Sequence, residues 1–131
     1  MPPARVKPIS ARIHGILDYL SVAVLVLSGP LLGFEGRPAE ITQTVAGSIL
    51  VYSAFTAYPP GFFHQVSLPI HRAIDIVVAL AMIVSPWLLG FRDIAEARNV
   101  FVLFGAVSLI IVALTDFTEM PHGARHRHPF T

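Results

Sequence analysis

The sequence predicts an all-α polytopic membrane protein with four transmembrane helices, built as two copies of one helical hairpin. Three observations support this fold class: the composition, the spacing of the charged residues and an internal repeat. Hydrophobic residues make up 54% of the 131 positions and charged residues only 13%. Because a soluble domain carries about 25% charged residues, we expect lipid to solvate the outer face of this protein.

The charged residues divide the chain into four long uncharged windows. These windows cover residues 19–34, 41–70, 76–91 and 99–115. The second window is too long for one crossing, but Pro59, Pro60 and Gly61 interrupt it. A bilayer core of about 30 Å takes roughly 20 helical residues, so the first and third helices must extend back past Asp18 and Asp75. The predicted helices span residues 13–32, 41–58, 71–89 and 99–117.

An internal repeat relates the two halves of the chain. Residues 14–34 align without gaps on residues 71–91, with seven of 21 positions identical: His14/His71, Asp18/Asp75, Ser28/Ser85, Leu31/Leu88, Leu32/Leu89, Gly33/Gly90 and Phe34/Phe91. The helices that follow match more weakly, with Thr56 and Tyr58 opposite Thr115 and Phe117. Chance similarity between apolar helices rarely places His, Asp, Ser and Gly in register, so the repeat indicates a duplicated hairpin.

The duplication predicts how the single transmembrane domain, residues 1–131, is organised. Repeat 1 covers about residues 13–58, a Pro-rich linker 59–70, repeat 2 about 71–117, and a basic, His-containing tail 118–131. Each repeat holds two crossings, so both copies enter the membrane in the same orientation about a pseudo-two-fold axis along its normal. Lys and Arg favour one side by six to three: Arg5, Lys7, Arg12, Arg72, Arg125 and Arg127 against Arg37, Arg92 and Arg98. This bias predicts that both termini are cytoplasmic.

Several classes of function lack support in the sequence. The chain has no Cys, which excludes disulfides, thiolate metal sites and covalently attached c-type haem. The net charge is only +1 and Lys7 is the single Lys, so there is no broad basic face for nucleic acid. The sequence holds no phosphate-binding glycine loop, dinucleotide fingerprint, nucleophile elbow or HExxH motif. We therefore expect no enzymatic activity.

A tripeptide at the end of the third predicted helix carries a resemblance to a known family. Ser85, Pro86 and Trp87, followed by Leu-Leu-Gly-Phe, resemble the SPW-repeat family of small bacterial and archaeal membrane proteins. The resemblance implies one or two copies of a two-helix unit in the bacterial cytoplasmic membrane, and it implies no reaction. The first copy reads Ser-Gly-Pro at residues 28–30 and lacks the Trp.

The motif also has a direct physical interpretation as an interface motif. Pro86 lacks an amide hydrogen and would weaken the last turn of its helix. Ser85 could satisfy a carbonyl that the proline frees. Trp87 sits where aromatic belts anchor helices at the lipid headgroups.

Polar residues gather at the cytoplasmic ends of the predicted helices. His14 and Asp18 are four residues apart, as are His71 and Asp75, so each pair shares one helix face. The predicted structural polar layer comprises Arg12, Asp18, Arg72, Asp75 and Asp116, with the two histidines beside them. The first interpretation is a lattice of ion pairs and hydrogen bonds that clamps the helices. The alternatives are a divalent metal held by two His and two Asp, axial ligation of haem or a chlorophyll-type pigment by His14 or His71, and a proton or ion path.

The function predicted from these features is non-catalytic. We expect an integral membrane protein that serves as an accessory or scaffolding subunit of a larger membrane complex, or that forms a homo-oligomer. Its partners would be the lipid bilayer and another membrane protein or a second copy of the chain. One alternative is a haem- or (bacterio)chlorophyll-binding protein that uses His14 and His71, and another is a small oligomeric transporter.

Overall fold

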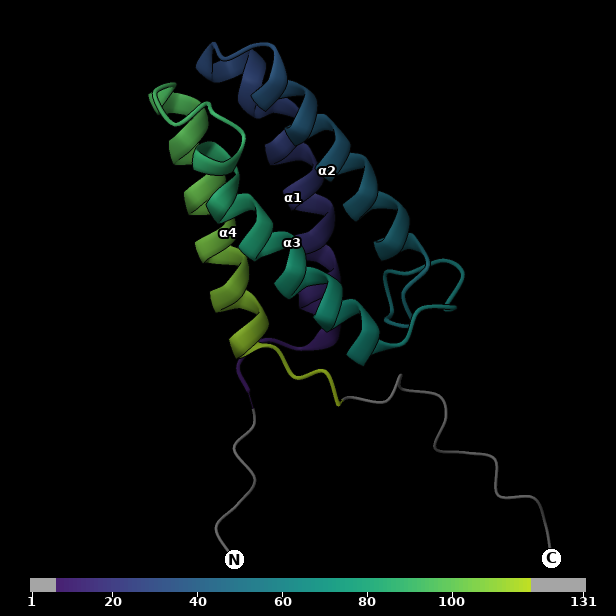
Figure 1. Cartoon of the computed structure of the whole chain (residues 1–131). Helices are drawn as coiled ribbons and strands as arrows, with labels where there is room; N and C mark the ends of the chain where they lie inside the picture. Colours follow the sequence, from purple (N-terminus) through teal and green to yellow (C-terminus); the bar gives the residue numbers. More distant parts are fainter. Residues whose placement is uncertain (1–6, 119–131) are drawn as a thin grey trace, which may run out of the picture.

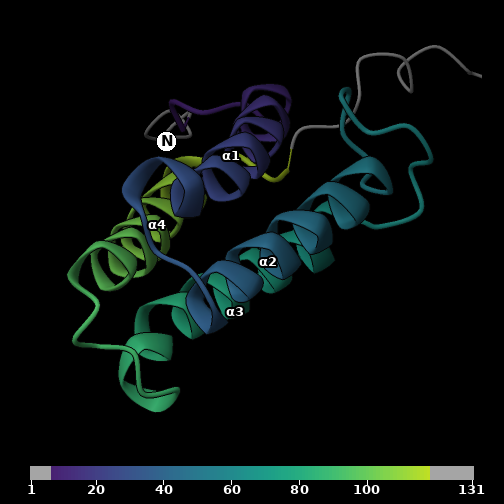
Figure 2. The same ribbon diagram turned by 90° about the horizontal axis from the view of Figure 1, so that it is seen from above.

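The computed structural model describes residues 7–118, and in this part of the chain four helices run alternately up and down (Figure 1). They are α1 (Ala11–Leu32), α2 (Arg37–Ala54), α3 (Leu68–Leu88) and α4 (Ala95–Leu114). The closest packing is between α1 and α2 and between α3 and α4, and Figure 2 shows the two pairs from above. The expected all-α fold of two hairpins that start at the same end is confirmed.

Three of the four helices are long and apolar enough to cross a membrane: α1, α3 and α4. Large apolar side chains on these helices face outward, among them Val24, Val77 and Leu103, as expected for contact with lipid. The remaining helix, α2, has 18 residues and is the least apolar of the four. Its length of about 27 Å is nevertheless close to the thickness of a bilayer core.

The helix boundaries differ from the prediction mainly in α2 and α4. Both helices begin four residues earlier than expected, at Arg37 and Ala95, and both end earlier, at Ala54 and Leu114. Each takes an acidic residue into its first turn, where the positive end of the helix dipole favours a carboxylate. Charged residues that were expected to precede α2 and α4 therefore lie inside the first turns of these helices. The α3 helix also begins earlier, at Leu68, with proline in its first turn.

The residues that follow α2 and α4 are not helical, and each of these segments pairs with the segment that precedes α3 or α1. Thr56, after α2, forms a parallel bridge with Val66, and Thr115, after α4, forms one with Ile9. The backbone hydrogen bonds correspond in the two copies: Val66 N to Phe55 O at 2.7 Å and Ala57 N to Val66 O at 2.8 Å, against Ile9 N to Leu114 O at 3.1 Å and Asp116 N to Ile9 O at 2.8 Å. The end of each hairpin is thus tied to the beginning of the other, as a pseudo-two-fold requires.

The apolar core fills the middle of the bundle and the end away from those bridges. Leu25, Met82 and Phe101 are almost fully buried there, one from each of α1, α3 and α4. Gly105 lets α4 approach α3 closely, because a Cβ at this position would lie 2.5 Å from the carbonyl oxygen of Ala79. Buried polar residues are concentrated at the other end, where α1 and α3 begin.

The two prolines inside helices are accommodated differently. Pro30 in α1 removes the amide that would bond the Val26 carbonyl, and the side-chain amide of Gln43 in α2 donates to that carbonyl at 3.0 Å. In α3, Pro86 leaves the carbonyl of Met82 without its amide, but the Ser85 hydroxyl donates to Ala81 instead, at 2.6 Å. The Ser85 hydroxyl therefore does not bond the carbonyl that Pro86 frees, contrary to the prediction.

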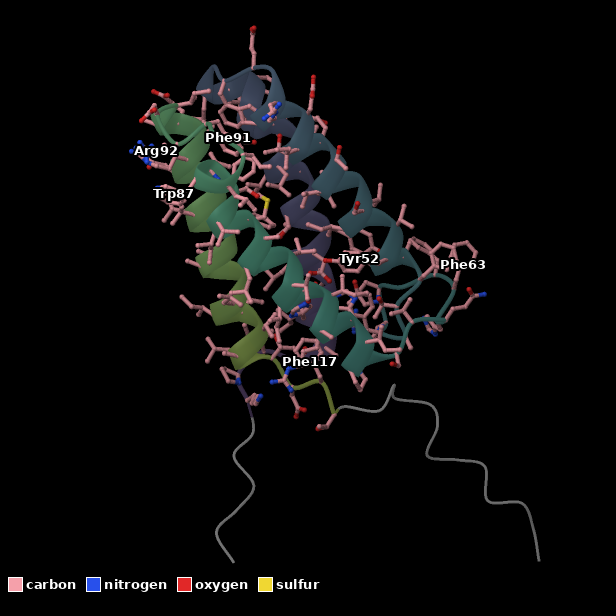
Figure 3. All side chains as sticks on the ribbon, in the orientation of Figure 1. Tyr52, Phe63, Trp87, Phe91, Arg92 and Phe117 are labelled. Atoms are coloured by element: carbon pink, nitrogen blue, oxygen red, sulfur yellow. The ribbon has the colours of Figure 1, made fainter. Side chains whose placement is uncertain are left out.

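Trp87 lies at the far end of the bundle from Phe117, near Arg92 (Figure 3). Trp87 is 53% exposed. This position is compatible with the predicted role of Trp87 as an anchor at the headgroups.

Candidate functional site

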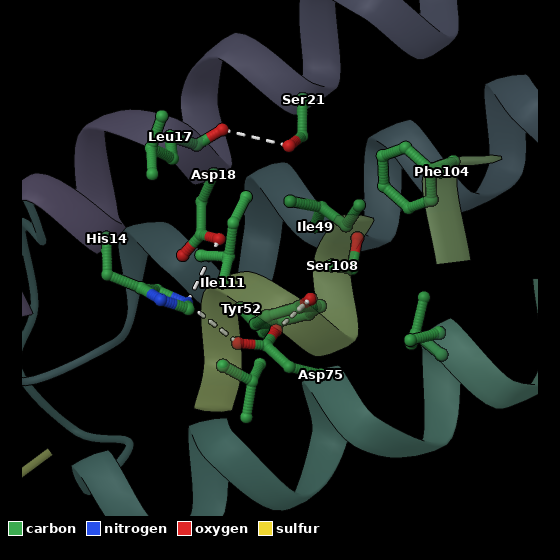
Figure 4. Close-up of a pocket in the computed structure, with 13 residues that line it drawn as sticks. His14, Leu17, Asp18, Ser21, Ile49, Tyr52, Asp75, Phe104, Ser108 and Ile111 are labelled. Carbon is green, nitrogen blue, oxygen red and sulfur yellow. Dashed lines mark hydrogen bonds and ion pairs between the residues drawn. The ribbon is translucent and has the colours of Figure 1, made fainter. Parts of the chain in front are cut away.

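Two histidines and two aspartates meet inside the bundle, one pair from α1 and one from α3. His14, Asp18, His71 and Asp75 are all buried, and we call these four residues the His–Asp cluster. The Nε2 atom of His14 lies 2.9 Å from Asp75 Oδ2 and 3.4 Å from Asp18 Oδ1. The Nε2 atom of His71 lies 3.0 Å from Asp18 Oδ2 and 3.2 Å from Asp75 Oδ2. Each imidazole therefore faces both carboxylates (Figure 4 shows the His14 side).

The cluster follows from the repeat. The spacing of four residues places His and Asp one above the other on one helix face, and the pseudo-two-fold turns the corresponding face of α3 toward that of α1. The sequence predicted that these four residues share one level. The structure goes further, because the shortest contact of His14 is to Asp75 in the other repeat rather than to its neighbour Asp18.

The other ring nitrogen of each histidine is held by a threonine from the opposite repeat. His14 Nδ1 lies 2.9 Å from Thr115 Oγ1, and His71 Nδ1 lies 2.6 Å from Thr56 Oγ1. Both hydroxyls also lie 2.6 Å from a carbonyl of the preceding helical turn, to which each donates its only proton. The hydroxyl oxygen must then accept from the histidine. Each Nδ1 therefore carries a proton, and each Nε2 points at the carboxylates.

Hydroxyl groups from α2 and the loop after it hold the two carboxylates. Tyr52 donates to Asp75 Oδ1 at 2.8 Å, and Tyr58 donates to Asp18 Oδ2 at 2.9 Å. Ser53 lies 3.4 Å from the same Asp18 oxygen. These contacts leave Asp75 Oδ2 and Asp18 Oδ1 directed only at the histidines.

Aromatic rings form the walls around the imidazoles. Phe117 packs edge-on against His14 with ring centroids 5.0 Å apart, and Tyr58 packs against His71 at 5.2 Å. The same Thr-x-aromatic sequence thus follows α2 and α4. In each case the threonine hydroxyl and the aromatic ring contact the histidine of the other repeat. These contacts of the threonines and aromatic residues with the histidines were not predicted from the sequence. The weak alignment of Thr56 and Tyr58 with Thr115 and Phe117 was the one feature that indicated them.

Three predicted members of the polar layer lie outside the cluster. Arg12 and Arg72 are exposed, and the Arg72 guanidinium lies over the Phe117 ring, 5.8 Å from its centroid. Asp116 accepts hydrogen bonds from Thr118, which hold the pKa of its carboxyl below the usual range. Within residues 7–118, no Lys or Arg forms an ion pair with a cluster carboxylate. The predicted tail beyond Thr118 lies outside the described residues.

The space beside the cluster is small. A cavity of about 30 Å³ is lined by His14, Asp18, Ser21, Tyr52 and Asp75, with apolar residues around them. Such a volume accommodates about one or two water molecules. A porphyrin needs a pocket of several hundred Å³, so this geometry gives no support to the pigment alternative.

The fold and the site define a helical integral membrane protein made of two hairpins that share one buried polar cluster. The family model of the SPW repeat domain matches residues 12–116. The chain therefore belongs to the SPW repeat family, which confirms the resemblance carried by Ser85, Pro86 and Trp87. No curated protein and no solved structure matches the chain.

Proposed function

We propose that this protein is a non-catalytic accessory or scaffolding subunit of the membrane, which assembles with another membrane helix through the outer face of α2. The observation that supports this proposal most is the character of α2 itself. It is the one helix among the four whose composition falls short of a membrane span. A helix of this kind gains from having its polar outer face covered by protein rather than by lipid.

The outer face of α2 has the features of a helix–helix contact in membranes. Thr44, Gly47, Ser48 and Val51 are exposed along it, and a Cβ on Gly47 would meet no atom within 4 Å. The hydroxyls of Thr44 and Ser48 donate to carbonyls of the preceding turn at 2.9 Å, so both can be covered without an unpaired hydrogen. Small residues and self-satisfied hydroxyls allow two helix backbones to approach closely.

The interior gives less support to the transporter alternative. The cavity beside the His–Asp cluster measures about 30 Å³, which is far below the volume of a small-molecule site. An accessory or scaffolding role needs no such space.

A single cysteine on α2 tests the proposal, because the chain has no Cys of its own. We expect Gly47→Cys that carries a thiol-linked benzophenone to form a photo-cross-link in native membranes, either to a second copy or to another membrane protein, since this reaction needs no cysteine on the partner. The matched control is Leu103→Cys on the exposed face of α4, which should remain uncross-linked. Mass spectrometry of the product distinguishes the homo-oligomer from the accessory subunit. No cross-link at Gly47, or equal cross-linking at Leu103, would contradict the proposal.

For the orientation, we propose that the end of the bundle with the His–Asp cluster faces the cytoplasm, on the basis of the Lys and Arg bias. Glu35 lies exposed at the opposite end and Gln65 is exposed in the loop between α2 and α3. An impermeant maleimide should label Glu35→Cys in intact cells and Gln65→Cys only after lysis. The reverse pattern would show that the orientation is inverted.

A further inference from the structure

We propose that the His–Asp cluster binds one divalent transition-metal ion of the zinc class. The ligands would be Nε2 of His14, Nε2 of His71 and one carboxylate oxygen from each of Asp18 and Asp75. This inference is independent of the proposed assembly through α2. It concerns a binding site formed jointly by the two repeats.

The positions of the four side chains suit such an ion. One ligand atom from each residue lies within 4.8 Å of the other three. Asp75 Oδ2 lies 2.9 and 3.2 Å from the Nε2 atoms of His14 and His71. Asp18 faces His14 with Oδ1 at 3.4 Å and His71 with Oδ2 at 3.0 Å, so a small rotation of this carboxylate would direct one oxygen at the ion. Zinc bonds of about 2.0–2.2 Å to N and O imply about 3.3–3.5 Å between neighbouring ligands of a tetrahedron. A small outward shift of the cluster would reach that geometry.

The charges favour a cation. Two carboxylates are buried together, and no Lys or Arg in residues 7–118 pairs with either of them. With the Nδ1 protons committed to threonines, neutral imidazoles would leave a charge of −2 in the interior, which is costly. One dication balances it. Imidazole and carboxylate together suit zinc and its first-row neighbours better than magnesium or calcium.

One buried nitrogen makes no hydrogen bond, although two carboxylates lie within ion-pair distance of it. His71 is fully buried, and its Nε2 makes no hydrogen bond in the structure. That nitrogen lies 3.0 and 3.2 Å from the two aspartates, yet its geometry fits a hydrogen bond to neither. It is therefore a buried nitrogen aimed into the centre of the cluster, where a metal would accept its lone pair.

The hydrogen-bond partners of the four candidate ligands also fit a metal site. Metal-binding histidines almost always donate their other N–H to a fixed acceptor, and metal-binding carboxylates are themselves hydrogen-bonded. Thr56 and Thr115 supply the acceptors for the two histidines, and Tyr52 and Tyr58 donate to the two carboxylates. Every candidate ligand thus has an outer partner that fixes its orientation. The rival arrangement is an ion-pair clamp, in which both imidazoles carry a second proton and no metal binds.

The test uses the full-length protein in mild detergent, stripped with chelator and reloaded with Zn²⁺ or Co²⁺ alone. Because His122, His126 and His128 of the tail can also bind metal, all three are changed to Gln in the reference protein. We expect one tightly held equivalent of Zn²⁺ by elemental analysis, a higher melting temperature with Zn²⁺, and the strong visible bands of tetrahedral Co²⁺. Absence of both the stoichiometric binding and the Co²⁺ bands in this protein would overturn the proposal.

Two further variants separate a metal site from a clamp. Thr56→Val removes the acceptor behind His71 and should weaken Zn²⁺ binding about 10–100-fold. Thr42→Val is the matched control, because Thr42 is equally buried but its hydroxyl donates only to the carbonyl of Ala39. Its Zn²⁺ affinity should equal that of the reference protein. Unchanged affinity in Thr56→Val, or equal losses in both variants, would contradict the assigned site.

Discussion

Replacing Asp75 by Ala should lower the free energy of unfolding of the metal-free protein by about 3–5 kcal/mol, the usual cost of removing one partner from a buried charged pair. Asp75 accepts a hydrogen bond from the Tyr52 hydroxyl, and its Oδ2 lies 2.9 Å from His14 Nε2. The alanine would leave the Tyr52 hydroxyl without its acceptor and would remove one of the two carboxylates that His14 and His71 face. Unfolding in detergent with chelator present, followed by far-ultraviolet circular dichroism, measures the loss.

The control for this loss is Asp93→Ala. The Asp93 side chain is 95% exposed, so its removal should change the stability by no more than about 0.5 kcal/mol. His14→Gln should fall between the two, because glutamine keeps a hydrogen-bonding side chain toward the cluster. A loss in Asp75→Ala no larger than in Asp93→Ala would mean that the aspartate is not held in the interior as described.

Adding a single methyl group at Gly105 should cost about 1–3 kcal/mol, the range for overpacking a well-packed interior. The Cβ of Gly105→Ala would meet the Ala79 carbonyl oxygen and the Cγ1 of Ile83, each at 2.5 Å. The carbonyl belongs to the backbone of α3, so the two helices would have to separate. The same unfolding experiment measures the effect.

Gly47→Ala is the matched control for Gly105→Ala when both are measured on the detergent-solubilised monomer, in which the proposed contact through α2 is absent. It introduces the same change within α2, where a Cβ would meet nothing within 4 Å. Alanine favours a helix over glycine by about 1 kcal/mol, so this variant should be neutral or slightly more stable. If Gly105→Ala behaved in the same way, α3 and α4 would not be in the close contact that the structure shows.

The repeat and the pairing of His with Asp could be predicted from the sequence because both follow from simple spacing. Four residues separate His14 from Asp18 and His71 from Asp75, and the 57-residue offset between the copies places them at one level. Which carboxylate each histidine contacts most closely could not be predicted. That choice depends on how α1 and α3 cross, and side-chain packing along both helices decides the crossing.

The roles of the arginines and of the threonines were harder to predict. Arg12 and Arg72 lie next to the cluster in sequence, but they face outward on their helices, where long side chains reach polar surroundings. Thr56 and Thr115 fall at helix ends, where an irregular backbone turns each toward the other repeat. The spacing rules used for regular helices do not apply to such positions, so the contacts of these threonines could not be predicted.

A double-mutant cycle between His14 and Asp75 tests the central claim, which is that the two repeats meet in one buried cluster. The two residues are 61 positions apart, and His14 Nε2 lies 2.9 Å from Asp75 Oδ2. If they are in contact, the losses of His14→Gln and Asp75→Ala should differ from additivity by about 0.5–3 kcal/mol. The control pair His14→Gln and Asp93→Ala should be additive. Additivity of the first pair to within about 0.3–0.5 kcal/mol would contradict the claim.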